Sequence, residues 1–391
     1  MLSKETIDII KSTVPVLEEH GTQITTVFYE ELFKAHPELL NIFNHANQAR
    51  GKQQTALANA VYAAAVHIDK LEAILPTVVQ ISHKHVSLGV KPEHYPVVGE
   101  YLLKAIKMVL GDAATPQILK AWEEAYGVIA DAFIGVEANM YEENEKKEGG
   151  WAFFKDFVVE KKVQESNVIT SFYLKPADSE RVPDFEPGQY ISVRVSIPGE
   201  KYMMIRQYSL SKTPSSDTFR ISVKKEDDNN PDGKVSVYLH EQVKEGDELE
   251  VSAPAGDFTL EKNADKPITF IAGGVGITPI MSMLETLAAE DSKRSVVFLQ
   301  AARTPEYAAF TKQIQNIQEK MPNLTYQTYY EDKRIDETVL KDMVKTDSDV
   351  YVCGPAGFME FVISTLYHSG VSKEQVHFEF FGPAADLEKA Q

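Results

Sequence analysis

The sequence predicts a multidomain protein that joins an all-α domain to an antiparallel β-barrel and then to a doubly wound α/β domain. Two observations carry this prediction. The hydrophobic period is helical over the first third of the chain, turns strand-like over the middle, and ends as apolar strands that alternate with helical stretches. The length of 391 residues is also typical of two or three domains.

Residues 1–141 form the predicted all-α domain. Runs such as TALANAVYAAAVHI keep a helical period, and little of this region alternates like a strand. The charged run YEENEKKEGG then closes with Gly149 and Gly150, which is typical of a helix end followed by a linker. We therefore expect a linker over residues 142–150.

Residues 151–262 are expected to form the antiparallel barrel. Short β-rich runs (FVVEKKV, VITSFYLK, QYISVRVSI, FRISVKKE and DELEVSAP) are separated there by clusters of Pro, Gly, Asp and Asn. Over residues 263–391 the apolar strands ITFIAGG, SVVFLQAA and DVYVCGP alternate with helical stretches such as PIMSMLETLAAE. This alternation predicts a parallel, doubly wound sheet.

Composition excludes several classes of partner. The formal net charge is −18, with 58 acidic and 40 basic residues, so nucleic acid and anionic membrane surfaces are not expected partners. A single cysteine, Cys353, excludes an internal disulfide. The N-terminus lacks the apolar core of a signal peptide, and no stretch approaches the roughly 18 apolar residues that a membrane span needs. We expect a cytoplasmic monomer that acts on small molecules.

Two histidines, His83 and His85, lie two positions apart in a segment with a helical apolar stripe. The stripe comprises Leu71, Ile74, Leu75, Val78, Ile81 and Leu88. His85 continues it, whereas His83 falls on the polar side. A histidine on an apolar face is commonly a core residue, but in an all-α domain of this length it also suits a haem held through one imidazole. Because there is no C-x-x-C-H motif, such a haem would be noncovalent.

With this histidine the first domain resembles a globin, and the whole chain resembles the bacterial flavohaemoglobins. The resemblance implies that His85 is the proximal ligand of a haem b iron. It also implies that Tyr95 and Glu137 hydrogen-bond around the other ring nitrogen and take part in catalysis. A capping or packing role for Tyr95 and a solvated helix position for Glu137 remain alternatives.

On the distal side the resemblance implies two further catalytic residues, Tyr29 and Gln53. Leu57 lies one helical turn after Gln53 and therefore on the same face, and Phe43 would pack against the porphyrin. An ordinary core tyrosine is the alternative for Tyr29, although its hydroxyl would then need a partner, which bound dioxygen would supply. Lys84 matches a family residue near the haem edge, and is otherwise a lysine on a helix surface.

A flavin site is implied by RQYSL at residues 206–210, flanked by EPGQY and GKVSVYLH. In the ferredoxin-reductase family, which this half resembles, the motif holds FAD. Arg206 suits a pyrophosphate because its planar fork donates two parallel bonds, and a surface ion pair is the alternative. Tyr208 would pack on the isoalloxazine, and a helix start would complete the anion site. The implied FAD residues are Tyr190, Arg206, Gln207, Tyr208, Ser209, Val235 and Ser236.

A nucleotide loop is implied by FIAGGVGITPIM, which follows a strand and opens a helix. It is not the full G-x-G-x-x-G fingerprint, because Pro279 stands at the third glycine position and the next strand ends in Gln300 instead of an acidic residue. It does match the reductase-type loop that binds NADH or NADPH. The preference between these two coenzymes stays open, because Arg303 would either bind a 2′-phosphate or face water. The implied residues are Gly273, Gly274, Val275, Gly276, Ile277, Thr278 and Pro279.

Two later segments complete the implied site. YVCGPAGFM places Cys353, Gly354 and Pro355 at a strand end, where the family positions the nicotinamide, although Cys353 is equally a small buried hydrophobe. HFEFFGP resembles the family segment over the flavin, but Phe380 stands where the family commonly has cysteine, which leaves the packing there open. The residues implied from this segment are Glu379, Phe380, Phe381, Gly382 and Pro383.

The resemblance implies a nitric oxide dioxygenase. NAD(P)H would reduce FAD, FAD would reduce haem, and dioxygen held at the haem would oxidise nitric oxide to nitrate. The residues themselves indicate only an oxygen-activating haem served by a flavin reductase. Two alternatives therefore stay open: a gas sensor or oxygen store whose reductase keeps the iron ferrous, and a reductase for a separate protein with a degenerate N-terminal domain.

Overall fold

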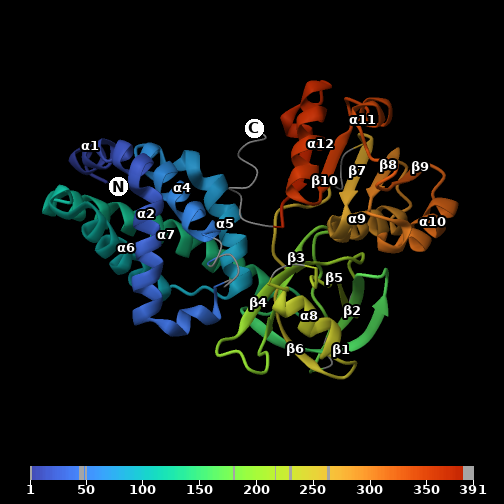
Figure 1. Cartoon of the computed structure of the whole chain (residues 1–391), viewed down its shortest axis with the longest axis horizontal. Helices are drawn as coiled ribbons and strands as arrows, with labels where there is room; N and C mark the ends of the chain where they lie inside the picture. The colour runs from blue at the N-terminus through green and yellow to red at the C-terminus, as the bar shows by residue number, and fades with distance from the viewer. Residues whose placement is uncertain are drawn as a thin grey trace. The chain divides into compact units, whose positions relative to one another are not determined.

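A computed structural model describes residues 2–43, 48, 51–178, 181–215, 217–228, 231–261 and 265–381. The chain divides into two compact units (Figure 1). The helical unit comprises Met1–Lys146, Trp151–Phe153 and Arg194–Arg206, and the reductase unit comprises Lys147–Gly150, Phe154–Val193 and Gln207–Gln391. The barrel and the α/β region, predicted as separate domains, thus fall mostly within one unit.

The helical unit is built from six described helices and three short 3₁₀ turns. The helices are α1 (Lys4–Ser12), α2 (Val14–Ala35), α4 (Lys52–Val66), α5 (Leu75–Leu88), α6 (His94–Leu110) and α7 (Pro116–Lys146). The 3₁₀ turns are η1 (Pro37–Asn41), η2 (Leu71–Ile74) and η3 (Gly111–Ala113). Local chemistry sets several of their ends: the Ser3 side chain caps α1 by accepting from Thr6 N at 3.0 Å, and Gly89, at φ 75°, ends α5.

Helix α2 supplies the centre of the helical core. Its buried Leu17, Ile24, Phe28 and Leu32 form one apolar face, and Trp122 of α7 belongs to the same cluster. Burying each such side chain contributes about 1.5–3 kcal/mol relative to leaving it in water. The packing of this face holds α2, with Tyr29 on it, against the rest of the unit.

The structure places the end of α7 inside the expected linker and the start of α5 inside the predicted apolar stripe. Helix α7 continues to Lys146, five residues into the predicted linker, because Glu142 and Lys146 favour helix and pair at 2.6 Å across one turn. Helix α5 begins at Leu75 and not at Leu71, with Pro76 in its first turn, where a missing N–H costs nothing. The start of the predicted stripe therefore lies in the 3₁₀ turn η2.

The first sheet of the chain has six strands and forms the predicted barrel. Their order is β4-β3-β6-β1-β2-β5, and β1 runs antiparallel to both β2 and β6. A bridge between Leu210 and Ile221 joins the two edges of this sheet. The strands are β1 (Phe154–Gln164), β2 (Ile169–Pro176), β3 (Tyr190–Val195), β4 (Met204–Ser209), β5 (Phe219–Lys224) and β6 (Glu248–Ser252), with helix α8 (Lys234–Glu241) between the last two.

The second sheet is wholly parallel, as the alternation of strands and helices predicts. Its order is β11-β10-β7-β8-β9, so the carboxyl ends of β7, β8 and β10 share one edge. The strands are β7 (Ile268–Gly273), β8 (Val296–Ala301), β9 (Leu324–Tyr329), β10 (Asp349–Cys353) and β11 (Val376–Glu379). The helices are α9 (Ile277–Ala289), α10 (Thr311–Lys320), α11 (Glu337–Met343) and α12 (Ala356–His368), with 3₁₀ turns η4 (Gly274–Gly276), η5 (Pro305–Tyr307) and η6 (Lys373–Gln375). Within the described ranges, no helix is long and apolar enough to cross a bilayer.

Candidate functional site

The structure brings His85, Tyr95 and Glu137 together from three helices. His85 Nδ1 lies 2.7 Å from Glu137 Oε1 and 3.1 Å from the Tyr95 hydroxyl, and that hydroxyl donates to Glu137 Oε1 at 2.6 Å. Because a carboxylate only accepts, Nδ1 carries the proton in this bond, and Nε2 keeps its lone pair. The imidazole is thus held in the tautomer that an axial haem ligand needs.

Burial keeps the Tyr95 hydroxyl protonated. Glu137 and Tyr95 are 3% and 8% exposed. Burial, and then the hydrogen bond to Glu137, raise the pKa of Tyr95 far above its ordinary value, so its phenol stays protonated and remains a donor. A solvated position for Glu137 is therefore excluded.

Phe133 is a member of this cluster that the sequence reasoning missed. It precedes Glu137 by one turn of α7, and its ring centroid lies 5.6 Å from that of His85 and 6.3 Å from that of Tyr95. Tyr126, another residue of α7, donates from its hydroxyl to the Tyr95 carbonyl at 2.7 Å. The spacing of four between Phe133 and Glu137 was the available signal, since it puts both side chains on one helix face.

The predicted apolar stripe of α5 and the helix face packed against protein share Val78 but are not identical. Val78, Ser82 and Val86 are the buried line, whereas Leu75 is 43% exposed and Ile81 is half-buried. His85, next to this line, is 31% exposed at its side chain and reaches Glu137. His83 is half-buried, and Lys84 is exposed on the same helix.

On the predicted distal side, Tyr29 is buried among aromatic rings. Its ring centroid lies 5.8 Å from that of Phe43 and 5.6 Å from that of Phe33, and Leu57 packs against the same core. Burial raises the pKa of Tyr29 well above its ordinary value, so the hydroxyl keeps its proton. Within the described part of the chain, no hydrogen bond to this hydroxyl is formed, and Gln53 Oε1 is buried without a partner. Such polar groups suit a small polar ligand.

The predicted flavin residues lie on β3, on β4 and at the start of α8. Arg206, Gln207 and Tyr208 are consecutive and half-buried on β4, which ends at the buried Ser209. Arg206 Nη1 donates to the Ile205 carbonyl at 2.7 Å. Tyr190 begins β3 and pairs with Ala255 through two backbone bonds of 2.9 Å.

Helix α8 presents its first turn without a side-chain cap, which suits an anion. Val235 is 1% exposed and Ser236 is 8% exposed. The Ser236 hydroxyl already donates to the Gly233 carbonyl at 2.9 Å and accepts from Glu226 N at 3.2 Å. Any contribution of these two residues to an anion site therefore comes from their backbone.

The glycine loop follows β7 and opens α9, as predicted. Gly274 is exposed at φ +55°, with open space where a side chain would project, so a ligand can approach its backbone. Glycine is required at position 276 for a different reason, because a Cβ there would lie 2.2 Å from the Cys353 carbonyl oxygen. Val275 is half-buried, whereas Gly273, Ile277, Thr278 and Pro279 are buried, so these four act through packing or backbone.

The strand end at Cys353 meets this loop. Its side chain is 0% exposed, and burial raises the pKa of the thiol well above its ordinary value. Gly354 is buried and Pro355 precedes α12. Glu379 ends β11 opposite Cys353, Phe380 is half-buried, and Phe381 is 46% exposed. Gly382 and Pro383 lie outside the described residues.

The end of β8 differs from a dinucleotide site with an acidic ribose ligand. Gln300 is 2% exposed; its Nε2 donates to the Ala309 carbonyl at 3.0 Å, and its Oε1 accepts from the Tyr326 hydroxyl. Arg303 pairs with Asp228 at 3.2 Å and lies over the Tyr307 ring at 5.8 Å. Its guanidinium is therefore held at the surface beside the strand end.

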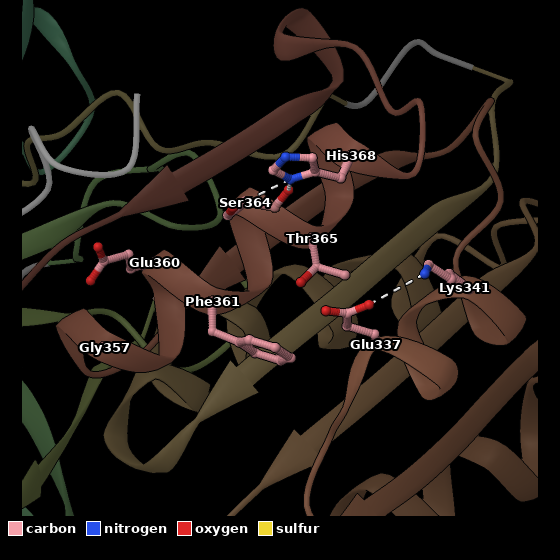
Figure 2. Close-up of a pocket in the computed structure, with 8 residues that line it drawn as sticks. All are labelled: Glu337, Lys341, Gly357, Glu360, Phe361, Ser364, Thr365 and His368. Carbon is pink, nitrogen blue, oxygen red and sulfur yellow. Dashed lines mark hydrogen bonds and ion pairs between the residues drawn. The ribbon is translucent and has the colours of Figure 1, made fainter.

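A surface cavity of about 570 Å³ lies between α11 and α12 (Figure 2). No predicted flavin or nucleotide residue lines it. Two pairs of its lining residues bond to one another: Lys341 Nζ donates to Glu337 at 3.3 Å, and His368 Nδ1 donates to the Ser364 carbonyl at 2.7 Å. The cavity is thus separate from the candidate sites.

Three family models match successive parts of the chain. Residues 26–133 match Globin, residues 156–260 match the Oxidoreductase FAD-binding domain, and residues 270–363 match the Oxidoreductase NAD-binding domain. The implied cofactors, haem, FAD and a nicotinamide dinucleotide, are thereby confirmed, and the side chains above fit them. The protein is an NAD(P)H-dependent flavohaem oxidoreductase.

Full-length relatives extend this match. The chain is 54% identical to a Flavohemoprotein of Bacillus cereus (strain ATCC 10987 / NRS 248), over 99% of this chain and 100% of the relative, and 51% identical to one of Bacillus subtilis (strain 168), over 99% of each. The flavohemoglobin of Malassezia yamatoensis, solved with bound FAD and heme, superposes with a TM-score of 0.86 at 29% identity and covers 97% of this chain and 100% of that one. The FAD/NAD-binding domain of a nitric oxide dioxygenase from Vibrio cholerae O1 biovar El Tor covers 59% of this chain and 99% of its own, with a TM-score of 0.55 at 38% identity. This chain therefore belongs to the flavohemoprotein family.

Proposed function

We propose that this protein is a nitric oxide dioxygenase, which uses NADH or NADPH and dioxygen to convert nitric oxide to nitrate. The observation that carries the proposal is the hydrogen bond of 2.7 Å between His85 Nδ1 and the buried Glu137 carboxylate. A carboxylate in this position gives the imidazole partial imidazolate character, which favours activation of dioxygen over its reversible storage. The solved Vibrio cholerae relative, a nitric oxide dioxygenase, adds support for the reductase half.

Each candidate site has a defined task in this proposal. His85 would hold haem; Tyr190 and the run from Arg206 to Ser209 would hold FAD; the Gly274 loop and the strand end at Cys353 would hold the nicotinamide dinucleotide. When bound, these groups supply a hydride donor, a carrier that turns electron pairs into single electrons, and an iron at which dioxygen reacts. Tyr29, protonated and buried, would donate to the partial negative charge that develops on dioxygen.

The decisive experiment measures products as well as consumption. Purified protein is given NADH, dioxygen labelled with ¹⁸O and nitric oxide, and nitrate is analysed by mass spectrometry. Each nitric oxide takes both oxygen atoms of one dioxygen and one electron, so one NADH serves two nitric oxide molecules. Doubly labelled nitrate in this ratio is the expected result.

Other outcomes separate the alternatives. A gas sensor or oxygen store would bind dioxygen yet show no rapid NADH use on addition of nitric oxide. A reductase for a separate protein would lack stoichiometric haem. Arg206→Ala is the matched control: it should lose flavin and NADH-driven turnover, while haem reduced by dithionite still binds dioxygen. Normal flavin content in that variant would contradict the role of Arg206.

A further inference from the structure

A buried ion pair lies inside the reductase unit, between two regions of different fold. Arg220 is on β5 of the antiparallel sheet, and Glu285 is on α9, which follows β7 of the parallel sheet. Arg220 Nη2 lies 2.8 Å from Glu285 Oε1, and their side chains are 3% and 11% exposed. Taking two charges out of water is costly, and apolar side chains of similar volume are often as stable. Stability alone is therefore a weak reason for this pair.

The guanidinium of Arg220 is held by hydrogen bonds and by an aromatic ring. Its Nε donates to the Ser211 hydroxyl at 3.1 Å, and its Nη2 also donates to the Ser211 carbonyl. Its central carbon lies 4.9 Å from the centroid of the Phe310 ring. A planar group that lies on an aromatic ring and is hydrogen-bonded along its edge has little freedom to rotate. The groups that it contacts are therefore kept at a fixed separation.

Glu285 fastens the same segment to α9 from the other side. Its Oε2 accepts from Thr213 N at 2.9 Å, and its Oε1 accepts from Gln313 Nε2. Two hydroxyls of α9 add to this attachment: Ser282 donates to the Lys212 carbonyl at 2.8 Å, and Thr286 donates to the Thr213 hydroxyl at 3.0 Å. Lys212 and Thr213 are thus held to α9 by side chains on successive turns of the helix, and Ser211 is joined to it through Arg220.

The two fastened parts lead directly to the two reductase cofactor sites. Residues 211–213 come just after β4, which ends with the flavin-motif residues Tyr208 and Ser209. Helix α9 begins at Ile277, just after the loop of Gly274–Gly276. Hydride transfer requires the reacting atoms about 3–3.5 Å apart, and a misplacement of about 1 Å costs on the order of 100-fold in rate.

We propose that Arg220 and Glu285 are positioning residues for hydride transfer. Their buried pair sets the distance and angle between the flavin strand β4 and the nucleotide loop that begins α9. The inference rests on the reductase half of the proposed function and needs neither nitric oxide nor dioxygen.

The test uses full-length holoenzyme and a double variant, Arg220→Met with Glu285→Gln. Because both charges are removed together, no unpaired charge is buried. Methionine fills much of the arginine volume, and the glutamine carbonyl still accepts from Thr213 N. The matched control is Arg294→Met with Asp349→Asn. This second buried pair, 3.2 Å long and 7% and 8% exposed, lies at the amino-terminal edge of the parallel sheet, away from the glycine loop.

Two measurements are made on each protein. Anaerobic stopped-flow mixing with NADH gives the limiting rate of flavin reduction per bound flavin, together with the NADH dissociation constant. Amide hydrogen exchange over residues 210–214 and 277–289, measured without NADH, reports the attachment directly. We expect the double variant to reduce its flavin about 10- to 100-fold more slowly, with an NADH dissociation constant within about twofold of wild type and faster exchange in both segments.

Three outcomes would overturn the proposal: an unchanged limiting rate despite faster exchange, an equal loss of rate in the control pair, or loss of the flavin itself. Arg220→Lys keeps the charge without the planar fork, so it should recover part of the rate. Reduction of the flavin by NADH involves neither nitric oxide nor dioxygen. A negative result in this test would therefore not contradict the proposed nitric oxide dioxygenase activity, and a lack of nitrate formation would not contradict the positioning role of Arg220 and Glu285.

Discussion

The two sides of the proposed haem pocket differ in whether their polar side chains are hydrogen-bonded to other residues of the protein. On the proximal side, His85, Tyr95 and Glu137 are joined by three hydrogen bonds of 2.6–3.1 Å. On the distal side, the Tyr29 hydroxyl and Gln53 Oε1 have no hydrogen-bond partner among the described residues. The proximal side is therefore organised before any ligand arrives, whereas the distal side offers donors and acceptors to one.

Removal of His85, the proposed proximal ligand, should have the largest effect on this comparison. We expect His85→Ala to lose haem or to leave an inactive iron, because the imidazole that would bind the iron is removed. His83→Ala is the control and should retain haem. The haem-to-protein absorbance ratio of each purified variant checks this. Equal loss from both would place the ligand elsewhere.

Tyr29→Phe isolates the distal hydroxyl, since it removes one oxygen and almost no volume. If this hydroxyl donates to dioxygen in a dry pocket, its loss should cost about 1.5–3 kcal/mol. Dioxygen would then leave on the order of ten to 150 times faster. Carbon monoxide is far less polarised and should change much less. Flash photolysis of the ferrous protein gives both rates; an equal factor for the two gases would assign the tyrosine to pocket shape alone.

The pKa of Tyr29 adds a pH test on the same hydroxyl. An ordinary tyrosine loses its proton near pH 10, whereas burial raises this pKa in the folded protein. The protonated donor is therefore kept below that pH, and its contribution disappears only when the pH rises through the raised pKa. We expect a flat dioxygen dissociation rate from about pH 6 to about pH 9.5 in the wild type. A rise within this range would contradict the protonated donor.

Glu137→Gln should weaken the hydrogen bond to His85 without causing loss of haem. An amide oxygen still accepts from His85 Nδ1, but charge-assisted hydrogen bonds are roughly twice as strong as neutral ones. Losing about 1–1.5 kcal/mol of stabilisation in the transition state should slow turnover about five- to tenfold, while haem content stays near that of wild type. Steady-state turnover per haem measures this. Unchanged turnover would reduce Glu137 to a structural residue.

Tyr95→Phe should have the smallest effect of the series. Glu137 loses one donor but keeps the bond to His85, so the cost is about 0.5–1.5 kcal/mol. We expect this in the free energy of unfolding of the helical unit, with at most a few-fold change in turnover per haem. A larger loss of turnover than in Glu137→Gln would make the tyrosine, and not the carboxylate, the main support of His85.

The sequence was informative where a residue type has one obvious chemistry. Local pattern alone predicts His85, in preference to His83, as the ligand, and it predicts the glycine loop after β7. Phe133 was missed because an aromatic residue in a helix is ordinarily read as core. The stripe predicted on α5 differs from the face that packs against protein, because apolar side chains look the same in sequence whether they pack against protein or line a pocket. The sequence does not predict β4 as a strand, because the adjacent polar residues Arg206 and Gln207 interrupt the alternation of apolar and polar side chains.

Gln300 has a consequence for redesign of coenzyme preference. In many dinucleotide folds, specificity is changed by exchanging the residue at the end of the second strand, because an acidic side chain there binds the ribose. Here both ends of the Gln300 amide are occupied, by the Ala309 carbonyl and the Tyr326 hydroxyl. Gln300→Glu would set a carboxylate against a carbonyl in the core and would damage the fold before it altered selectivity. An engineer who wishes to change the choice between NADH and NADPH should therefore begin at the surface, with Arg303 and Asp228.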